Sequence, residues 1–167
     1  KRIFYFLFFN SLFLLLTSFV YASETTVYLG GVEKTIETGE VKIYIPAGSA
    51  TVVRTNNKTE YLYADHLGST VLATKDDGTK EDSLLYYPYG NQVGPIPPIG
   101  QISDKLYTGQ RFDSSSDLYF YNARYYNPTI GNFISADKAQ GPNRYAYVGN
   151  NPVMRNDPSG MVQTEFS

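Results

Sequence analysis

The sequence predicts an all-β fold built from consecutive hairpins. Tyrosine and phenylalanine, which both favour strands, account for all the aromatic residues, with 16 Tyr, 10 Phe and no Trp. Fourteen glycines and nine prolines supply frequent turns. Between these turns the apolar residues form short alternating runs, as strands do. A chain of 167 residues is long enough for one sizeable core and too short for two full domains.

The N-terminal segment has a different pattern. Lys1 and Arg2 precede the apolar run at residues 3–19, and Val20-Tyr21-Ala22 is a small-residue cleavage pattern. Residues 1–22 are therefore predicted to be a secretory signal peptide. A retained membrane anchor is the alternative, because a run of about 17 residues is near the lower limit for a membrane span. The predicted location is extracellular or at the cell surface, with the periplasm as a second compartment.

Alternating runs begin directly after this segment. Residues 26–29, 41–45, 51–54 and 61–63 are each typical of a strand, and turn residues follow them. Residues 23–60 are expected to form an N-terminal β segment.

The next turn signal is Asp76-Asp77-Gly78, which lies between the apolar runs 69–73 and 83–87. It predicts a hairpin whose two central turn positions have positive φ. A calcium loop is excluded, because the ladder of alternating carboxylates and the distal glutamate are missing. The proline-rich segment 94–100 is expected to be an exposed connector, with proline recognition as the alternative role.

Tyrosine-centred units recur through the second half of the chain. They begin near Tyr61, Tyr86, Tyr107, Tyr125 and Tyr145, at intervals of 25, 21, 18 and 20 residues. This self-similarity predicts a repeated hairpin array, whose units each need neighbours to bury their apolar face. One set of rings is expected to pack in the hairpin core, with a carbohydrate-binding surface as the alternative. This set is Tyr119, Tyr121, Tyr125 and Tyr126.

Composition argues against several other classes of site. The net charge of −2 comes from scattered charges, which gives no electrostatic footprint for nucleic acid. The chain has no cysteine, which excludes disulfides, thiolate metal sites and a cysteine nucleophile. His66 is the only histidine, and no G-x-S-x-G motif accompanies it. We expect His66 to pack in the turn at residues 67–69, and we expect no metal site and no cofactor.

Seven motifs occur in series between residues 61 and 161. They are YADHLGS (63–69), YPYG (87–90), YTGQRFD (107–113), LYFYNARYYNP (118–128), GNFISAD (131–137), YAYVGNNP (145–152) and DPSG (157–160). They resemble the elements DHLGS, YDPFG, FTGREYD, LYYYRARYYDP, GRFLSADP, YAYVGNNP and DPSG of the Rhs repeat-associated core, in the same order. That family is related to the shells of toxin-complex C components and of teneurins. The resemblance implies that residues 61–161 form part of a β-spiral that wraps into a hollow shell.

The resemblance also implies a self-cleavage site. Full-length members of the family are thought to cut themselves just after the DPxG-L element, which matches the Met161–Val162 bond here. Asp137 and Asp157 match the two carboxylates of an aspartic-type mechanism, and Arg124 matches an arginine needed for cleavage. Two close carboxylates can divide the roles of acid and base, and a nearby arginine can hold one of them charged.

A purely structural interpretation of the same residues stays open. Asp157-Pro158-Ser159-Gly160 has the composition of an ordinary turn, Asp137 can end a strand, and Arg124 can pair with a surface acid.

Taken together, these patterns predict an exported structural and interaction segment of an Rhs/YD-repeat shell, and a truncated remnant of a polymorphic toxin or cell-surface protein. A self-cleaving aspartic-type peptidase is the first alternative, and a carbohydrate-binding module is the second. Residues 162–167 are expected to be a short tail with no toxin domain attached. The expected partners are other shell segments or a second copy, through exposed β-edges. Contact with a membrane is expected only through an uncleaved signal segment.

Overall fold

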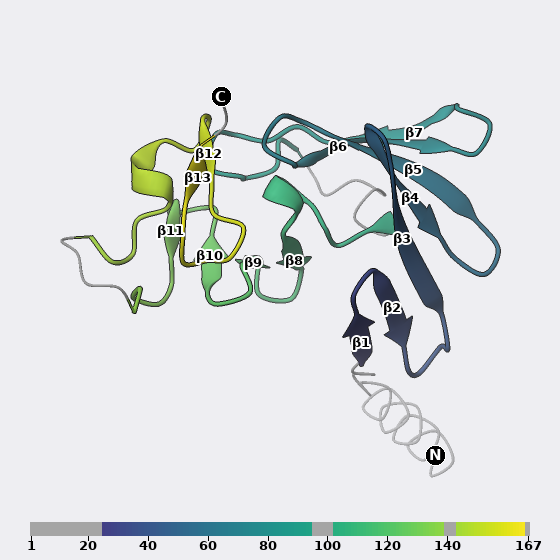
Figure 1. The fold of residues 1–167 in the computed structure, drawn as a ribbon, viewed down its shortest axis with the longest axis horizontal. Coiled ribbons are helices and arrows are strands. Elements are labelled where there is room, and N and C mark those ends of the chain that lie inside the picture. The colour runs from purple at the N-terminus through teal and green to yellow at the C-terminus, as the bar shows by residue number, and fades with distance from the viewer. Residues whose placement is uncertain (1–24, 95–101, 139–142, 166–167) are drawn as a thin grey trace, which may run out of the picture.

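A computed structural model describes residues 25–94, 102–138 and 143–165, and the described part of the chain is built from antiparallel strands and turns (Figure 1). The all-β prediction is confirmed. No helix in these ranges is long and apolar enough to cross a membrane. The predicted signal peptide and most of the proline-rich segment lie outside the described residues.

A seven-stranded sheet forms the first half of the molecule, and each strand pairs with the next along the chain. The strands are β1 (Thr26–Leu29), β2 (Val32–Thr35), β3 (Val41–Ala47), β4 (Ala50–Arg54), β5 (Thr59–Ala64), β6 (Thr70–Lys75) and β7 (Lys80–Ser83). Short polar or glycine-containing turns connect them, so every ladder is local in sequence. This order leaves β1 and β7 as the two edges of the sheet.

The second half is a module of much shorter strands beside the sheet (Figure 1). It contains the 3₁₀ turn η1 (Tyr107–Gly109), then β8 (Arg111–Asp113), β9 (Leu118–Phe120), β10 (Tyr125–Asn127) and β11 (Asn132–Phe133), which form a four-stranded sheet. The turn η2 (Val148–Asn150) follows, and β12 (Arg155–Asn156) pairs with β13 (Thr164–Glu165). We refer to residues 102–165 as the C-terminal module.

One continuous core runs from the covered face of the sheet into the C-terminal module. The sheet contributes small and branched side chains such as Val53, Leu62 and Ala73. The module contributes rings packed edge to face or tilted, which suits their quadrupoles. These buried rings are Tyr107, Tyr119, Tyr121, Tyr126, Phe133 and Tyr147. Because aromatic side chains bury large areas, they can stabilise a module whose strands are only two or three residues long.

Burial decides between the two interpretations of the tyrosine set. Tyr119, Tyr121 and Tyr126 are fully buried, which confirms their packing in the core and removes them from any sugar-binding surface. Tyr125 differs: its side chain is 42% exposed and its ring packs on Phe120.

Several predicted elements need correction. The hairpin at Asp76-Asp77-Gly78 forms, but only Gly78 of these three has positive φ, at +82°. Its return strand is β7, which ends at Ser83, so the prediction of a strand over residues 83–87 was wrong. The LYFYNARYYNP motif at residues 118–128 is divided between β9 and β10 by a tight turn in which Asn122 has φ +60°.

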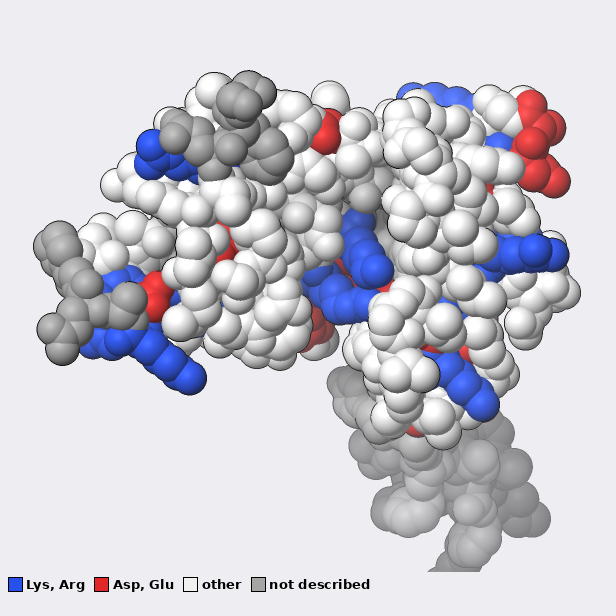
Figure 2. Space-filling view, viewed as in Figure 1, with Lys and Arg blue, Asp and Glu red and all other residues white. Residues whose placement is uncertain are grey.

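A polar junction joins the sheet to the C-terminal module. Arg111 Nη2 lies 2.7 Å from the buried carboxylate of Glu33 on β2, and Nη1 donates to both oxygens of Asp104 at 2.8 Å. The guanidinium also stacks over the ring of Tyr28, 3.8 Å from its centroid. A cleft of about 440 Å³ lies here, lined in part by Tyr28, Lys105 and Arg111, and Figure 2 shows basic side chains in the hollow between the two halves.

Candidate active site

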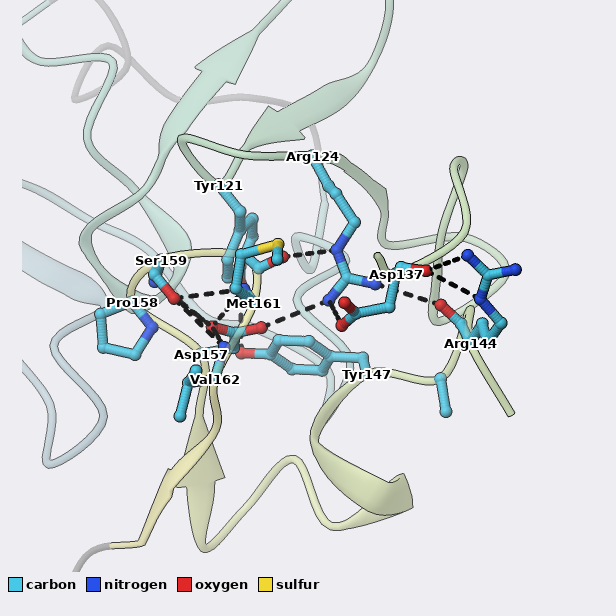
Figure 3. Close-up of polar contacts among 12 residues, drawn as sticks. Tyr121, Arg124, Asp137, Arg144, Tyr147, Asp157, Pro158, Ser159, Met161 and Val162 are labelled. Atoms are coloured by element: carbon cyan, nitrogen blue, oxygen red, sulfur yellow. Dashed lines mark hydrogen bonds and ion pairs between the residues drawn. The ribbon is translucent and has the colours of Figure 1, made fainter. Parts of the chain in front are cut away.

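The three residues proposed from the family motif come together at one place in the C-terminal module (Figure 3). Arg124 Nη2 lies 3.1 Å from Asp137 Oδ2 and 3.5 Å from Asp157 Oδ2. Arg124 precedes β10, Asp137 follows β11 and Asp157 follows β12, so three separate strand ends build the site. The side chains of Arg124 and Asp157 are only 6% and 5% exposed, and that of Asp137 is partly exposed.

Arg124 is fixed by contacts on all sides. Its Nε donates to the Gly160 carbonyl, and Nη1 donates to the Arg144 carbonyl at 3.1 Å. The guanidinium packs over the ring of Phe133, 3.6 Å from the centroid, as cation–π contacts do. A buried arginine held in this way presents its remaining donor to both carboxylates without reorganisation.

Asp157 lies beside the Met161–Val162 peptide bond, which the motif resemblance predicts to be the cleavage site. Its Oδ1 accepts hydrogen bonds from the amides of Met161 at 3.1 Å and Val162 at 3.0 Å. The amide and hydroxyl of Ser159 donate to the same oxygen, at 3.3 and 3.2 Å. The carboxylate therefore lies within hydrogen-bond reach of the nitrogen of the Met161–Val162 peptide bond.

Ser159 is a further site residue, which the motif resemblance did not indicate. Its Oγ also accepts from the amides of Met161 and Val162, at 3.1 and 3.2 Å. Its position inside the DPSG turn was the available signal, because a serine in such a turn bonds nearby backbone amides.

Gly160 lets the turn approach the hairpin between β9 and β10. Its φ is +71°, and a Cβ at this position would overlap the carbonyl oxygen of Tyr121. Only glycine fits here, because it accepts both the left-handed conformation and the close approach of another backbone.

A network of neutral tyrosine hydroxyls lies close to Asp157. Thr108 Oγ1 lies 2.8 Å from the hydroxyl of Tyr121, which donates to the hydroxyl of Tyr147 at 3.2 Å. Burial raises the pKa of both tyrosines, and the charge of Asp157 raises the pKa of Tyr147 further. Both hydroxyls therefore keep their protons at neutral pH, so this network carries no charge of its own.

His66 lies apart from this site. The prediction that it packs in its own turn was wrong, because its side chain is exposed and Nε2 lies 3.0 Å from the carbonyl of Val153. Asp65, its neighbour, accepts from the amides of Leu67 and Ser69. Across the described ranges, no group of three or more His, Asp or Glu side chains is arranged to hold a metal ion.

Comparison with known proteins places the chain in a family. No family model matches the chain. Salivary gland surface protein 1 of Aedes aegypti is 38% identical over 132 residues, which are 77% of this chain and 4% of that protein. Toxin subunit YenC1 of Yersinia entomophaga is 36% identical over 66% of this chain and 12% of its own length. The crystal structure of TcdB2-TccC3-Cdc42 superposes with a TM-score of 0.72 at 29% identity, covering 83% of this chain and 8% of that one. The chain belongs to the Rhs/YD-repeat family.

The family assignment has two consequences. The fold predicted from the seven motifs, consecutive hairpins of a YD-repeat shell, is confirmed by the likeness to the TcdB2-TccC3 structure. The chain spans no more than 12% of the length of Salivary gland surface protein 1 or of YenC1, so it corresponds to a small part of these two relatives.

Proposed function

We propose that this Rhs/YD chain is an exported structural segment of a YD-repeat shell, and that its β1 edge pairs with a strand of a neighbouring shell segment or of a second copy. Its relatives include a toxin subunit, and one of its structural neighbours is a Tc holotoxin pore of Photorhabdus luminescens, which supports both export and a shell role.

The observation that carries this proposal is the exposed, apolar edge of the sheet. Within the described residues β1 pairs only with β2. The side chain of Leu29 is 78% exposed, and Val27 beside it is half exposed. By the strand register, Leu29 shares a face with Ile43 and Ile45, which are also exposed. An unpaired strand edge next to an uncovered apolar face is a template for another strand.

The opposite edge is different. Strand β7 consists of Lys80-Glu81-Asp82-Ser83, and charged side chains on an edge strand oppose pairing. Association in one direction, through β1, follows from this asymmetry.

The remaining parts of the chain fit the same proposal. Residues 1–22 serve as the export signal, residues 23–60 as the partial repeats that join a neighbour, residues 61–161 as the Rhs repeat-associated core and residues 162–167 as a tail. A match to 12% of YenC1 is consistent with descent from a longer toxin or cell-surface protein.

Light scattering tests the shell role. Residues 23–167 are expected to associate as concentration rises, and the double variant Val27→Lys with Leu29→Lys is expected to stay monomeric. The matched control is Val153→Lys with Met154→Lys, which alters two similarly exposed apolar residues in the C-terminal module. A wild-type chain that stays monomeric, or a control pair that abolishes association equally, would contradict the proposal.

The second candidate function is a single self-cleavage at Met161–Val162. It is favoured by the 3.0 Å distance from Asp157 Oδ1 to the Val162 nitrogen and by the 3.1 Å ion pair between Arg124 and Asp137. The ion pair with Arg124 suits Asp137 to the role of base, and the position of Asp157 beside the Val162 nitrogen suits it to the role of acid when its carboxyl is protonated.

The step balances as a hydrolysis. Asp137 removes a proton from a water molecule, whose oxygen attacks the carbonyl carbon of Met161. The bond from that carbon to the Val162 nitrogen breaks, and Asp157, which has to enter the step protonated, gives its proton to the nitrogen. The products are a carboxyl terminus at Met161 and an amino terminus at Val162.

Intact-mass measurement tests this second function. Loss of residues 162–167 from the wild-type chain, abolished by Asp137→Asn and by Asp157→Asn but not by the exposed-turn control Asp76→Asn, is the expected result. A wild-type mass that stays unchanged over days would show that the site is inherited without activity.

A further inference from the structure

Three consecutive residues at the tip of the β9–β10 hairpin bond three consecutive carbonyls of the turn that precedes Met161. The bonds run from Asn122 Nδ2 to Pro158 O (2.9 Å), from Ala123 N to Ser159 O (3.2 Å) and from Arg124 Nε to Gly160 O. This one-to-one register links two segments that are 36 residues apart in the chain.

We infer that the hairpin tip, residues 122–124, is a clamp that sets the position of the Met161–Val162 bond against Asp157, and that Asn122 is a positioning residue. The inference rests on the self-cleavage proposed above. It gives Asn122 a role in that reaction, exerted through the hydrogen bond from its side chain to the Pro158 carbonyl.

The turn is held from two sides. Its carbonyls accept bonds from the hairpin tip, and on the other side the amides of Ser159, Met161 and Val162 converge on Asp157 Oδ1. Gly160 lies against Tyr121 with no room for a side chain. If the hydrogen bonds from the hairpin tip to the turn carbonyls are lost, the turn can move away from the hairpin. The distance from Asp157 to the Val162 nitrogen is then no longer fixed.

Asn122 suits this position for two reasons. Its φ of +60° lies in the left-handed region, which asparagine tolerates better than most residues. Its amide supplies the N–H that the Pro158 carbonyl accepts, and Gln110 Nε2 donates to the same carbonyl at a longer 3.3 Å. The Pro158 carbonyl is therefore held chiefly by Asn122.

The sharpest test is Asn122→Asp, which keeps the size and the turn preference but removes the donor. Because a displacement of about 1 Å can cost a factor of about 100 in rate, the loss of one of three clamp bonds is expected to slow cleavage about tenfold or more. The full chain is purified in urea and refolded by dilution, and intact mass is followed over time. Asn150→Asp is the matched control, because Asn150 is exposed and has φ +64°.

A second readout does not depend on cleavage. In the Asp137→Asn background, hydrogen exchange of the Met161 and Val162 amides is expected to quicken about tenfold with Asn122→Asp, because the amides lose their fixed acceptor. The melting temperature is expected to match that of the Asn150→Asp control, which separates positioning from loss of stability.

The outcomes are distinguishable. If the wild-type chain never cleaves, but exchange quickens with Asn122→Asp, self-cleavage fails and the clamp stands as a structural device. If the wild-type chain cleaves, and Asn122→Asp changes neither its rate nor its exchange, the clamp is overturned and self-cleavage stands. A chain that neither cleaves nor shows faster exchange overturns both.

Discussion

The seven-stranded sheet and the C-terminal module are stabilised in different ways. Each sheet strand is four to seven residues long and pairs with the next strand in the sequence. The covered face of the sheet carries small apolar side chains such as Val53 and Ala73. The module has strands of two or three residues, and buried tyrosine and phenylalanine rings hold it together. This difference shows that the sheet is stabilised by backbone hydrogen bonds between strands adjacent in sequence. The module depends instead on contacts between aromatic rings that are far apart in the chain.

Alkaline pH is expected to separate the two regions most strongly. Burial raises the pKa of the module tyrosines Tyr107, Tyr119, Tyr121, Tyr126 and Tyr147 above 10. A group whose folded pKa is raised contributes stability that is full below the unfolded pKa of about 10 and is lost as pH rises beyond it. Each such tyrosine costs about 1.4 kcal/mol per pH unit above that point.

Tyrosinate absorbance with hydrogen exchange near pH 11 checks this prediction. The module is expected to open while the sheet ladders, whose covered face carries only Tyr44 of the buried tyrosines, persist longer. Opening of the sheet first would contradict the comparison.

The junction between the two regions is expected to give the next largest effect. Arg111→Met removes the partner of the buried Glu33 carboxylate and is expected to cost about 3–5 kcal/mol of unfolding free energy. Urea denaturation measures this. Adding Glu33→Gln to the same variant is expected to recover part of the lost unfolding free energy. A double variant less stable than Arg111→Met alone would contradict the explanation that the loss comes from the unpaired Glu33 charge.

A glycine that packs against the C-terminal module is expected to tolerate alanine less well than a glycine in a turn of the sheet. At Gly90, with φ +90°, an added Cβ would overlap the Tyr107 ring, so Gly90→Ala is expected to cost about 2–5 kcal/mol from strain and overpacking together. Thermal melts of both alanine variants check the difference.

Gly78 is the matched control and the smallest effect. It has φ +82° in the β6–β7 turn, with no atom within 4 Å of an added Cβ. Gly78→Ala is therefore expected to cost only about 1–2 kcal/mol, the cost of the left-handed conformation. Equal losses at Gly78 and Gly90 would contradict the packing argument.

The sequence was informative where the physical signal is local. Alternation located β1, β3, β4 and β5, because a strand with one covered face shows its period in a few residues. It missed β2, whose residues Val32-Glu33-Lys34-Thr35 mix buried charge with polar positions. It also placed the strand after Asp76-Asp77-Gly78 too late, because β7 is charged and has no apolar signature.

The site required a different kind of information. The motif resemblance supplied Arg124, Asp137 and Asp157, and the fold brings them within 3.5 Å of one another through Arg124. Asn122 and Ser159 could not be singled out, because their contacts depend on how the hairpin tip meets the DPSG turn. Spacing along a single sequence does not contain that information.

Hydrogen exchange of residues 23–167 at low and high protein concentration tests the central claim. That claim is that the β1 edge of the sheet pairs with a neighbouring strand, whereas the C-terminal module is folded without a partner. Raising the concentration is expected to slow exchange of the β1 amides, at Thr26–Leu29, and to leave exchange of the β8 to β11 amides unchanged. Slowing confined to the C-terminal module, or no slowing at any concentration, would contradict it.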